Sequence, residues 1–290
     1  MERDTPSPAV QRRRLRAELR RIRLGLNQTQ EQVAAAMDWS LSKLIRIENG
    51  SVNISTNDLK VLLDYYGIVD DRRMDELVTL AKAARERSWW SMYRDVASPP
   101  LLQFIEYQAA AMITRNLEPL LIPGLLQTEE YAREVIKEFS GRPRPPKDRL
   151  DALVALRMKR QELLTRTGPP PWFFFILDEA VLHRVVGSKD VMSRQIRHLI
   201  ELAGREDVII EVVPFTAGVQ YGMHGPFVIL EFEEVEDDDV LYLESPRGDL
   251  IHRDNPEEIL TYREIFEELR HMSLGEGSVE FLRGLLDEMT

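Results

Sequence analysis

The sequence contains no cysteine among its 290 residues. This absence excludes a disulfide framework, a thiolate nucleophile and a zinc site with cysteine ligands, and it fits a protein of the reducing cytosol. No apolar run approaches the roughly 20 residues that cross a bilayer, and the first ten residues lack the apolar stretch of a secretory signal. We therefore expect a cytoplasmic protein that does not engage a membrane.

Familiar catalytic and metal-binding patterns are missing as well. The five histidines include no H-x-x-x-H or H-x-x-E-H pair, so a histidine-based metal site is not expected. No G-x-S-x-G motif, Walker loop or dinucleotide fingerprint occurs. Carboxylates are so plentiful that any two would make only a weak candidate for an acid/base pair. We expect neither enzymatic activity nor a cofactor.

Positive charge is scarce overall but unevenly distributed. The net charge is -11, yet residues 1–88 carry 16 Lys and Arg against 13 Asp and Glu, whereas residues 89–290 carry 22 against 36. Seven arginines fall within one predicted helix: Arg12, Arg13, Arg14, Arg16, Arg20, Arg21 and Arg23. Such a helix provides a local field that attracts phosphate, although a solvated helix face is the alternative. The acidic total therefore does not exclude a nucleic-acid partner.

Residues 29–50, TQEQVAAAMDWSLSKLIRIENG, predict two short helices joined by a tight turn. Thr29 is a suitable N-cap for the first helix and Ser40 for the second, in which Leu44 and Ile47 form a buried stripe. The residues that project elsewhere are Leu41, Ser42, Lys43 and Arg46. A polar outward face after a capped turn is typical of a helix that reads the major groove of DNA.

This segment resembles the helix-turn-helix of phage-repressor-like regulators, the Xre family. The resemblance rests on Gln30, Ala34 and Ser40 and on the closing residues 47–50 (IENG). It implies that Gln30 and Ser40 contact backbone phosphate. It also implies that Leu41, Ser42 and Arg46 face base edges, and Lys43 either a base or a phosphate.

The resemblance further implies that Arg23 pairs with Glu48 as a structural brace between the first helix and the reading helix. One reading helix covers only half of an operator, so we expect a homodimer on double-stranded DNA. Further helices are predicted over residues 10–26, 55–66 and 71–87, with Asn27 and Gly67 as helix stops. Together these helices predict an all-α, five-helix, repressor-like domain over residues 8–88.

Residues 89–290 predict an α+β domain with a small sheet and several helices. The expected strands are 172–177 (WFFFIL), 208–213 (VIIEVV), 226–232 (PFVILEF) and 240–243. The expected helices are 101–115, 128–139, 147–167, a short one after Asp178, 190–204, 256–272 and 278–289.

Five segments of this part resemble the uncharacterised domain that follows an Xre-type domain in actinobacterial regulators, including the WhiJ-like group. They are PGLLQTEEYA at 123–132, RMKRQ at 157–161, LDEAVLHRVVG at 177–187, VVPFTAG at 212–218 and GPFVILEF at 225–232. The resemblance implies a transcription factor, often encoded beside a small partner protein in an antitoxin-like arrangement.

Polar residues beside apolar helical stripes suggest a ligand pocket in the second domain. The candidates are Glu106, Gln127, Tyr131, Arg157 and Gln161. The alternative is a hydrogen-bond network that holds the domain together. The sequence thus predicts a sequence-specific DNA-binding transcriptional regulator whose C-terminal domain senses a small-molecule effector or a partner protein and supports dimerisation. The alternative function is an antitoxin-like interaction protein that binds a small partner and regulates its own operon.

Overall fold

The computed structural model describes residues 8–50, 52–86, 88–140, 144–165, 171–232, 239–244, 250–252 and 255–289. The chain divides into two compact units, and the division falls between Ser91 and Met92. Within the ranges described, no helix has the length and apolar character needed to cross a membrane.

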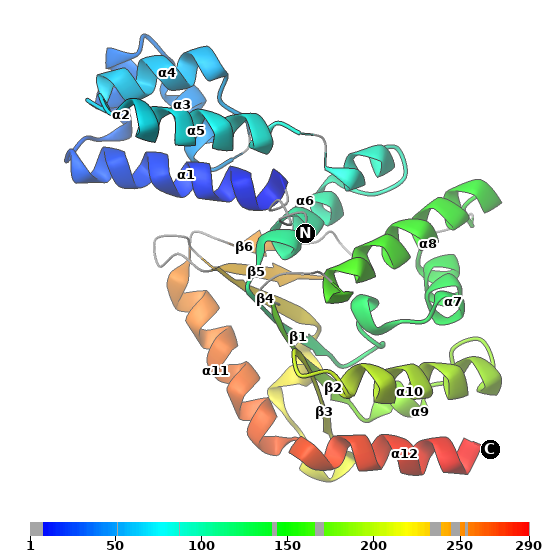
Figure 1. Ribbon diagram of the computed structural model, residues 1–290. Helices are drawn as coiled ribbons and strands as arrows, with labels where there is room; N and C mark the ends of the chain where they lie inside the picture. Colours follow the sequence, from blue (N-terminus) through cyan, green and yellow to red (C-terminus); the bar gives the residue numbers. More distant parts are fainter. Residues whose placement is uncertain are drawn as a thin grey trace. The chain divides into compact units, whose positions relative to one another are not determined.

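The N-terminal unit consists of five helices, coloured blue to cyan in Figure 1. They are α1 (Pro8–Gly25), α2 (Gln30–Ala36), α3 (Leu41–Glu48), α4 (Thr56–Tyr65) and α5 (Asp71–Ala84). Asn27 and Gly67 follow α1 and α4 with φ of 53° and 74°. Both predicted helix stops are therefore confirmed, because a left-handed residue ends an α-helix. The predicted all-α class of this unit is confirmed as well.

Each of these helices contributes to one apolar core. Leu19, Val33, Leu44, Leu62 and Leu77, one from each helix in order, are at most 1% exposed. Burying a side chain of this size contributes about 1.5–3 kcal/mol. The spacing of these residues thus fixes which face of each helix points inward and leaves the opposite faces for solvent or a partner.

The C-terminal unit is built on a six-stranded sheet in the order β3-β2-β1-β4-β5-β6 (Figure 1). The strands are β1 (Ile113–Glu118), β2 (Trp172–Asp178), β3 (Val208–Val213), β4 (Phe227–Glu231), β5 (Val240–Leu243) and β6 (Leu250–His252). Strands β1, β2 and β3 are parallel, whereas β4, β5 and β6 add in antiparallel fashion. The α+β prediction and all four expected strands are confirmed.

The prediction for residues 101–115 was wrong in its second half. Helix α6 (Pro99–Ala110) ends before Arg115, and residues 113–118 form the central strand β1. The reason is tertiary: β1 is paired along its length with β2 on one side and β4 on the other. Strand β6 was not predicted, because a strand of three residues is too short to show a periodic pattern of apolar side chains. The helix expected to reach residue 167 ends at Gln161 and continues as a 3-10 turn to Thr165, and residues 166–167 lie outside the described ranges.

Helices cover both faces of the sheet. Helix α11 (Pro256–Met272) packs on the face that carries Leu117 and Ile229. Helix α6 packs on the opposite face over Leu230 and Tyr242. The remaining helices are α7 (Glu129–Phe139), α8 (Lys147–Gln161), α9 (Ala180–His183), α10 (Lys189–Ala203) and α12 (Ser278–Met289). Of these, α7, α9, α10 and α12 share the core over β2 and β3 on the α6 side.

A polar row interrupts the α6 side of the sheet. Strand β1 places Thr114, Asn116 and Glu118 on that side, because alternate residues of a strand point to opposite faces. The register pairs this row with Phe173 and Phe175 of β2 on one flank, and apolar β4 residues lie on the other. Two apolar clusters are thus separated by a line of polar side chains in the middle of the sheet.

Candidate functional site

The turn between α2 and α3 is fixed by local hydrogen bonds. Thr29 and Gln32 form a reciprocal capping box at the start of α2. Asp38 adopts a left-handed conformation with φ of 54°, and the Trp39 N–H donates to the Ala34 carbonyl at 2.8 Å. The Ser40 hydroxyl accepts from the Lys43 N–H at 3.2 Å and caps α3. A serine hydroxyl that accepts in this way keeps its own proton for a phosphate oxygen.

A buried ion pair ties α1 to α3. The Arg23 Nε and Nη2 donate to the two carboxylate oxygens of Glu48 at 2.7 and 2.9 Å. The side chains of Arg23 and Glu48 are only 8% and 5% exposed, and Arg23 Nη1 also donates to the Gln28 carbonyl at 2.9 Å. This bidentate pair joins the Nε/Nη2 edge of the guanidinium group to both carboxylate oxygens, so it fixes the position of α3 relative to α1.

The Gln30 amide belongs to the same network. Its Nε2 donates to a Glu48 oxygen at 2.7 Å. One of its two N–H bonds is therefore engaged within the protein, and a phosphate contact at Gln30 has to use the other.

Four exposed side chains form the outward face of α3. Leu44 and Ile47 are buried, and the residues on the solvent side are Leu41, Ser42, Ile45 and Arg46. Arg46 Nε donates to the Ser42 carbonyl one turn earlier at 3.2 Å, which leaves the terminal guanidinium nitrogens for another acceptor. Sequence reasoning missed Ile45. Ile45 directly follows Leu44 of the buried stripe, and on a helix this position turns the side chain away from the core.

Lys43 does not lie on this outward face. Its ammonium lies 3.1 Å from an Asp58 carboxylate oxygen on α4 and 4.0 Å from the centroid of the Trp39 ring. These contacts direct Lys43 toward the flank of α3.

The arginines of α1 do not share one solvent-facing side. Arg13 and Arg23 are 6% and 7% exposed, so Arg13 does not contribute to an exposed basic face, whereas the burial of Arg23 agrees with its expected role as a brace. Arg13 lies four residues after Ala9 and four before Ala17, and these three residues form a second buried stripe that the leucine spacing did not reveal. Among the others, Arg14, Arg20 and Arg21 are exposed.

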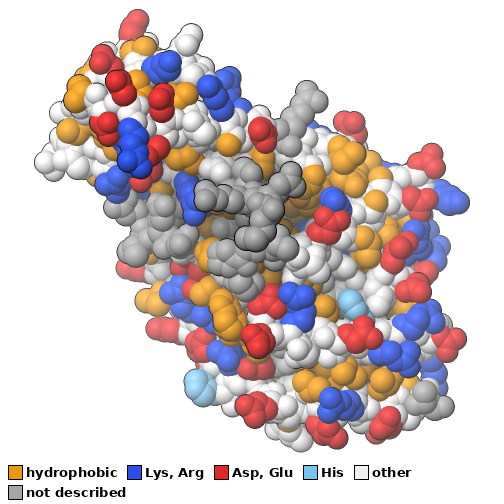
Figure 2. Space-filling view, viewed as in Figure 1, with side chains coloured by type: hydrophobic (Ala, Val, Ile, Leu, Met, Phe, Trp, Pro, Cys, Tyr) orange, Lys and Arg blue, Asp and Glu red, His pale blue; other side chains and the backbone are white. Residues whose placement is uncertain are grey.

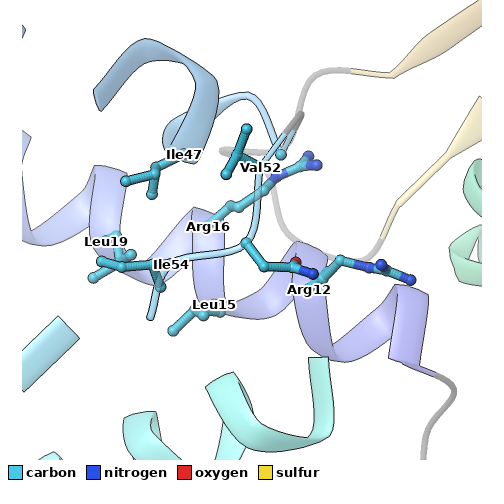
Figure 3. Close-up of a pocket in the computed structure, with 9 residues that line it drawn as sticks. Arg12, Leu15, Arg16, Leu19, Ile47, Val52 and Ile54 are labelled. Carbon is cyan, nitrogen blue, oxygen red and sulfur yellow. The ribbon is translucent and has the colours of Figure 1, made fainter. Parts of the chain in front are cut away.

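A small pocket lies where α1 meets the segment that follows α3 (Figure 3). Its volume of about 20 Å³ has room for about one water molecule, so it does not suit a metabolite. Arg16 crosses over Gly50 here, and a Cβ at Gly50 would stand 2.0 Å from Arg16 Nη1. Gly50 also has a φ of 77°. The glycine that closes the motif is thus favoured by its backbone conformation, and any other residue would also displace the flexible end of the Arg16 side chain.

In the C-terminal unit, three of the predicted pocket residues hold the segment that precedes α7. Gln127 Nε2 donates to the Ile122 carbonyl at 2.6 Å, and the Tyr131 hydroxyl accepts from the Ile122 N–H at 3.2 Å. Gln161 Nε2 donates to the carbonyls of Gly124 and Gln127 at 3.0 and 2.7 Å. These contacts match the alternative of a hydrogen-bond network. Glu106 belongs to another element, α6.

Arg157 connects this network to a cluster of charged side chains. Its Nη1 donates to Gln127 Oε1 at 2.8 Å. Arg157 and its neighbour Arg160 both have lowered pKa values, that of Arg160 to about 10, because burial desolvates them and, for Arg160, because Arg157 repels it. Burial and the negative charge of Glu244 raise the pKa of Glu118 well above its usual range. Sequence reasoning found Arg157 but missed Arg160 and Glu118.

The ranges described contain no group of three or more His, Asp or Glu side chains placed to hold a metal ion. On the face in Figure 2, acidic and basic side chains alternate over much of the surface.

The two units correspond to two family matches. Residues 101–284 match a family described as a domain of unknown function, DUF5753. The chain belongs to the DUF5753 family. Residues 14–77 match a helix-turn-helix domain. No curated protein and no solved structure matches the chain.

The helix-turn-helix match covers the capped turn, the brace and the outward face of α3. It supports a DNA-binding regulator. The DUF5753 match extends from α6 to α12 and assigns no activity to the sheet-based unit.

Proposed function

We propose that this protein is a sequence-specific transcriptional regulator that inserts α3 into the major groove of an operator. The observation that carries the proposal is the outward face of α3, in which Leu41, Ser42, Ile45 and Arg46 are all exposed next to a buried brace. A rigid helix with a mixed polar and apolar face suits direct readout, because base edges offer both hydrogen-bonding groups and thymine methyls.

Each side chain has a distinct role in this proposal. The terminal nitrogens of Arg46 bind the O6 and N7 of a guanine, and Leu41 and Ile45 pack against thymine methyl groups. The Ser40 hydroxyl and Lys43 bind backbone phosphate and set the position of the helix. The protein acts as a homodimer, since two reading helices are needed for a two-fold symmetric operator.

Selection from random duplexes followed by titration tests this assignment. The change is Arg46→Ala, measured by fluorescence anisotropy on the selected duplex and on a duplex of scrambled sequence. We expect a loss of about 1–3 kcal/mol of discrimination against the wrong base.

Arg72→Ala is the matched control. Arg72 is an arginine of α5 with a side chain 87% exposed, and it lies outside the two helices of the motif. Its substitution should leave the discrimination unchanged. If Arg46→Ala retains full discrimination, Arg46 does not read a base.

The C-terminal unit, in this proposal, couples a signal to DNA binding and performs no catalysis. One observation favours a second candidate signal, a partner protein, as in an antitoxin-like pair. The segment after β3 exposes four large apolar side chains, Phe215, Val219, Tyr221 and Met223, which are between 47% and 93% exposed. Exposed apolar patches of this kind mark interaction surfaces.

The partner candidate is tested by purification from the native host. A partner that binds this segment should co-purify with the wild type and be lost from a Phe215→Ser, Met223→Ser double variant. Equal recovery with both proteins would exclude this segment as the binding surface.

A further inference from the structure

Two guanidinium groups of α8 converge, and the carboxyl groups of Glu118 and Glu244 act electrostatically on both of them. The position that a Cβ on Gly124 would occupy lies 3.2 Å from Arg160 Nη2 and 3.4 Å from Arg157 Nη1, so both groups approach one point. Among the residues described, Arg160 Nε is buried without a hydrogen-bond partner. Desolvated charges in proteins are normally paired. Because the raised pKa of Glu118 favours its neutral form, the two guanidinium groups are opposed mainly by Glu244, which leaves positive charge for a further anion.

The wall opposite α8 is formed by α6. Arg160 lies over the Phe104 ring at 5.3 Å, and Phe104 in turn stacks on Tyr242 of β5 with centroids 4.0 Å apart. Gln108 follows Phe104 by one helical turn and therefore shares its face of α6. The arginines and this face of α6 thus flank the same part of the sheet.

Between these walls lies the polar row of β1. Thr114 is paired with Leu230, which packs against Phe104 in the α6 cluster. Gln108 and Thr114 are 4% and 1% exposed, yet Gln108 Oε1 and Thr114 Oγ1 have no partner in the part of the chain that the structure describes. A buried polar group left unpaired is unfavourable, and a ligand that donates a hydrogen bond to it would offset this cost.

Glu118 ends the polar row beside the arginines. Because its pKa is raised, its carboxyl group carries a proton under conditions in which an exposed glutamate does not. A protonated carboxyl donates a hydrogen bond and does not repel an anion. Glu118 is therefore compatible with an oxyanion held by Arg157 and Arg160.

We propose that the space between α6, α8 and β1 binds a small phosphorylated metabolite, with its phosphate on Arg157 and Arg160 and its hydroxyl or amine donors on Gln108 and Thr114. A phosphate dianion matches two adjacent guanidinium groups in charge and in hydrogen-bonding geometry. The two side-chain oxygens select a ligand that carries donors beyond the phosphate. The inference rests on the proposed sensing role of the C-terminal unit and names the class of its ligand.

Calorimetric titration of the full chain tests the proposal with three probes: inorganic phosphate, ribose 5-phosphate and uncharged ribose. Ribose 5-phosphate should bind more tightly than phosphate, and ribose should not bind. Arg160→Met should weaken binding of both anions about tenfold or more, because methionine is a long side chain that carries neither the charge nor the hydrogen-bond donors of arginine. Arg149→Met is the matched control, because Arg149 is an exposed arginine on the same helix, and it should bind as the wild type does.

Gln108→Leu separates the two ends of the site. This variant should bind phosphate normally and ribose 5-phosphate more weakly, because only the second probe reaches the amide oxygen. Absence of binding by either anion, or equal binding by Arg160→Met and wild type, would overturn the proposal. Normal DNA binding by the same preparation would show that this failure concerns the ligand site and not the regulator function.

Discussion

The Arg23–Glu48 brace offers a prediction that can be worked from the structure. In Glu48→Ala, the guanidinium of Arg23 loses two hydrogen bonds and remains in a position where the side chain is 8% exposed. Removing one partner of a buried ion pair costs about 3–5 kcal/mol. Total stabilities of domains are about 5–15 kcal/mol. We therefore expect Glu48→Ala to leave the N-terminal unit close to unfolding, and DNA binding to fall with it.

Urea unfolding of the full chain, with hydrogen exchange to assign the transition of α1–α5, measures this effect. Glu48→Gln keeps one acceptor and should lose less than Glu48→Ala, and the double change Arg23→Met, Glu48→Leu should recover part of the loss because no charge stays buried alone. Arg72→Ala breaks an exposed pair and should cost less than about 1 kcal/mol. A comparably small loss in Glu48→Ala would refute the reasoning.

Two further predictions concern single residues. The pKa of Glu118 is raised in the folded protein above its ordinary value of 4.5. The protonated carboxyl group is therefore compatible with folding below that pH, and the protein loses stability as the pH rises toward the folded-state pKa and the buried group has to ionise. Glu118→Gln should therefore have a higher urea midpoint of unfolding than the wild type at pH 8 and a similar midpoint at pH 4. If the two midpoints differ by the same amount at both pH values, the prediction is contradicted. Gly50→Ala should destabilise the N-terminal unit by about 1–2 kcal/mol from the left-handed backbone alone, and by more if Arg16 has to move. Thermal unfolding checks this, with Gly25→Ala, where a Cβ meets nothing within 4 Å, as the control.

Much of the N-terminal unit could be predicted because its signals are local. Thr29, Ser40, Asn27 and Gly67 act through caps and left-handed stops that depend on a few neighbouring residues. The Arg13 error had a different origin. The sequence gives the leucine stripe of α1 clearly, but whether a second side of the helix is buried depends on packing.

Strand β1 shows why the centre of the sheet was harder to predict. Its sequence ITRNLE does not alternate between apolar and polar residues, Arg, Leu and Glu are good helix formers, and the preceding segment is helical. Pairing with β2 and β4 decides the outcome, and those partners lie more than 50 residues away in sequence. The candidate ligand site depends on this strand, so Glu118 could not be placed beside Arg160 before the sheet order was known.

The most direct test of the central claim is in vitro selection of random DNA duplexes by the full-length protein, read by sequencing. The account predicts an enriched palindrome whose half-sites are one helical turn apart, about 10–10.5 base pairs centre to centre, or a multiple of it. It also predicts that Arg46→Ala loses preference at one guanine in each half-site. Enrichment of no motif by a folded protein, or an unchanged motif with Arg46→Ala, would contradict it.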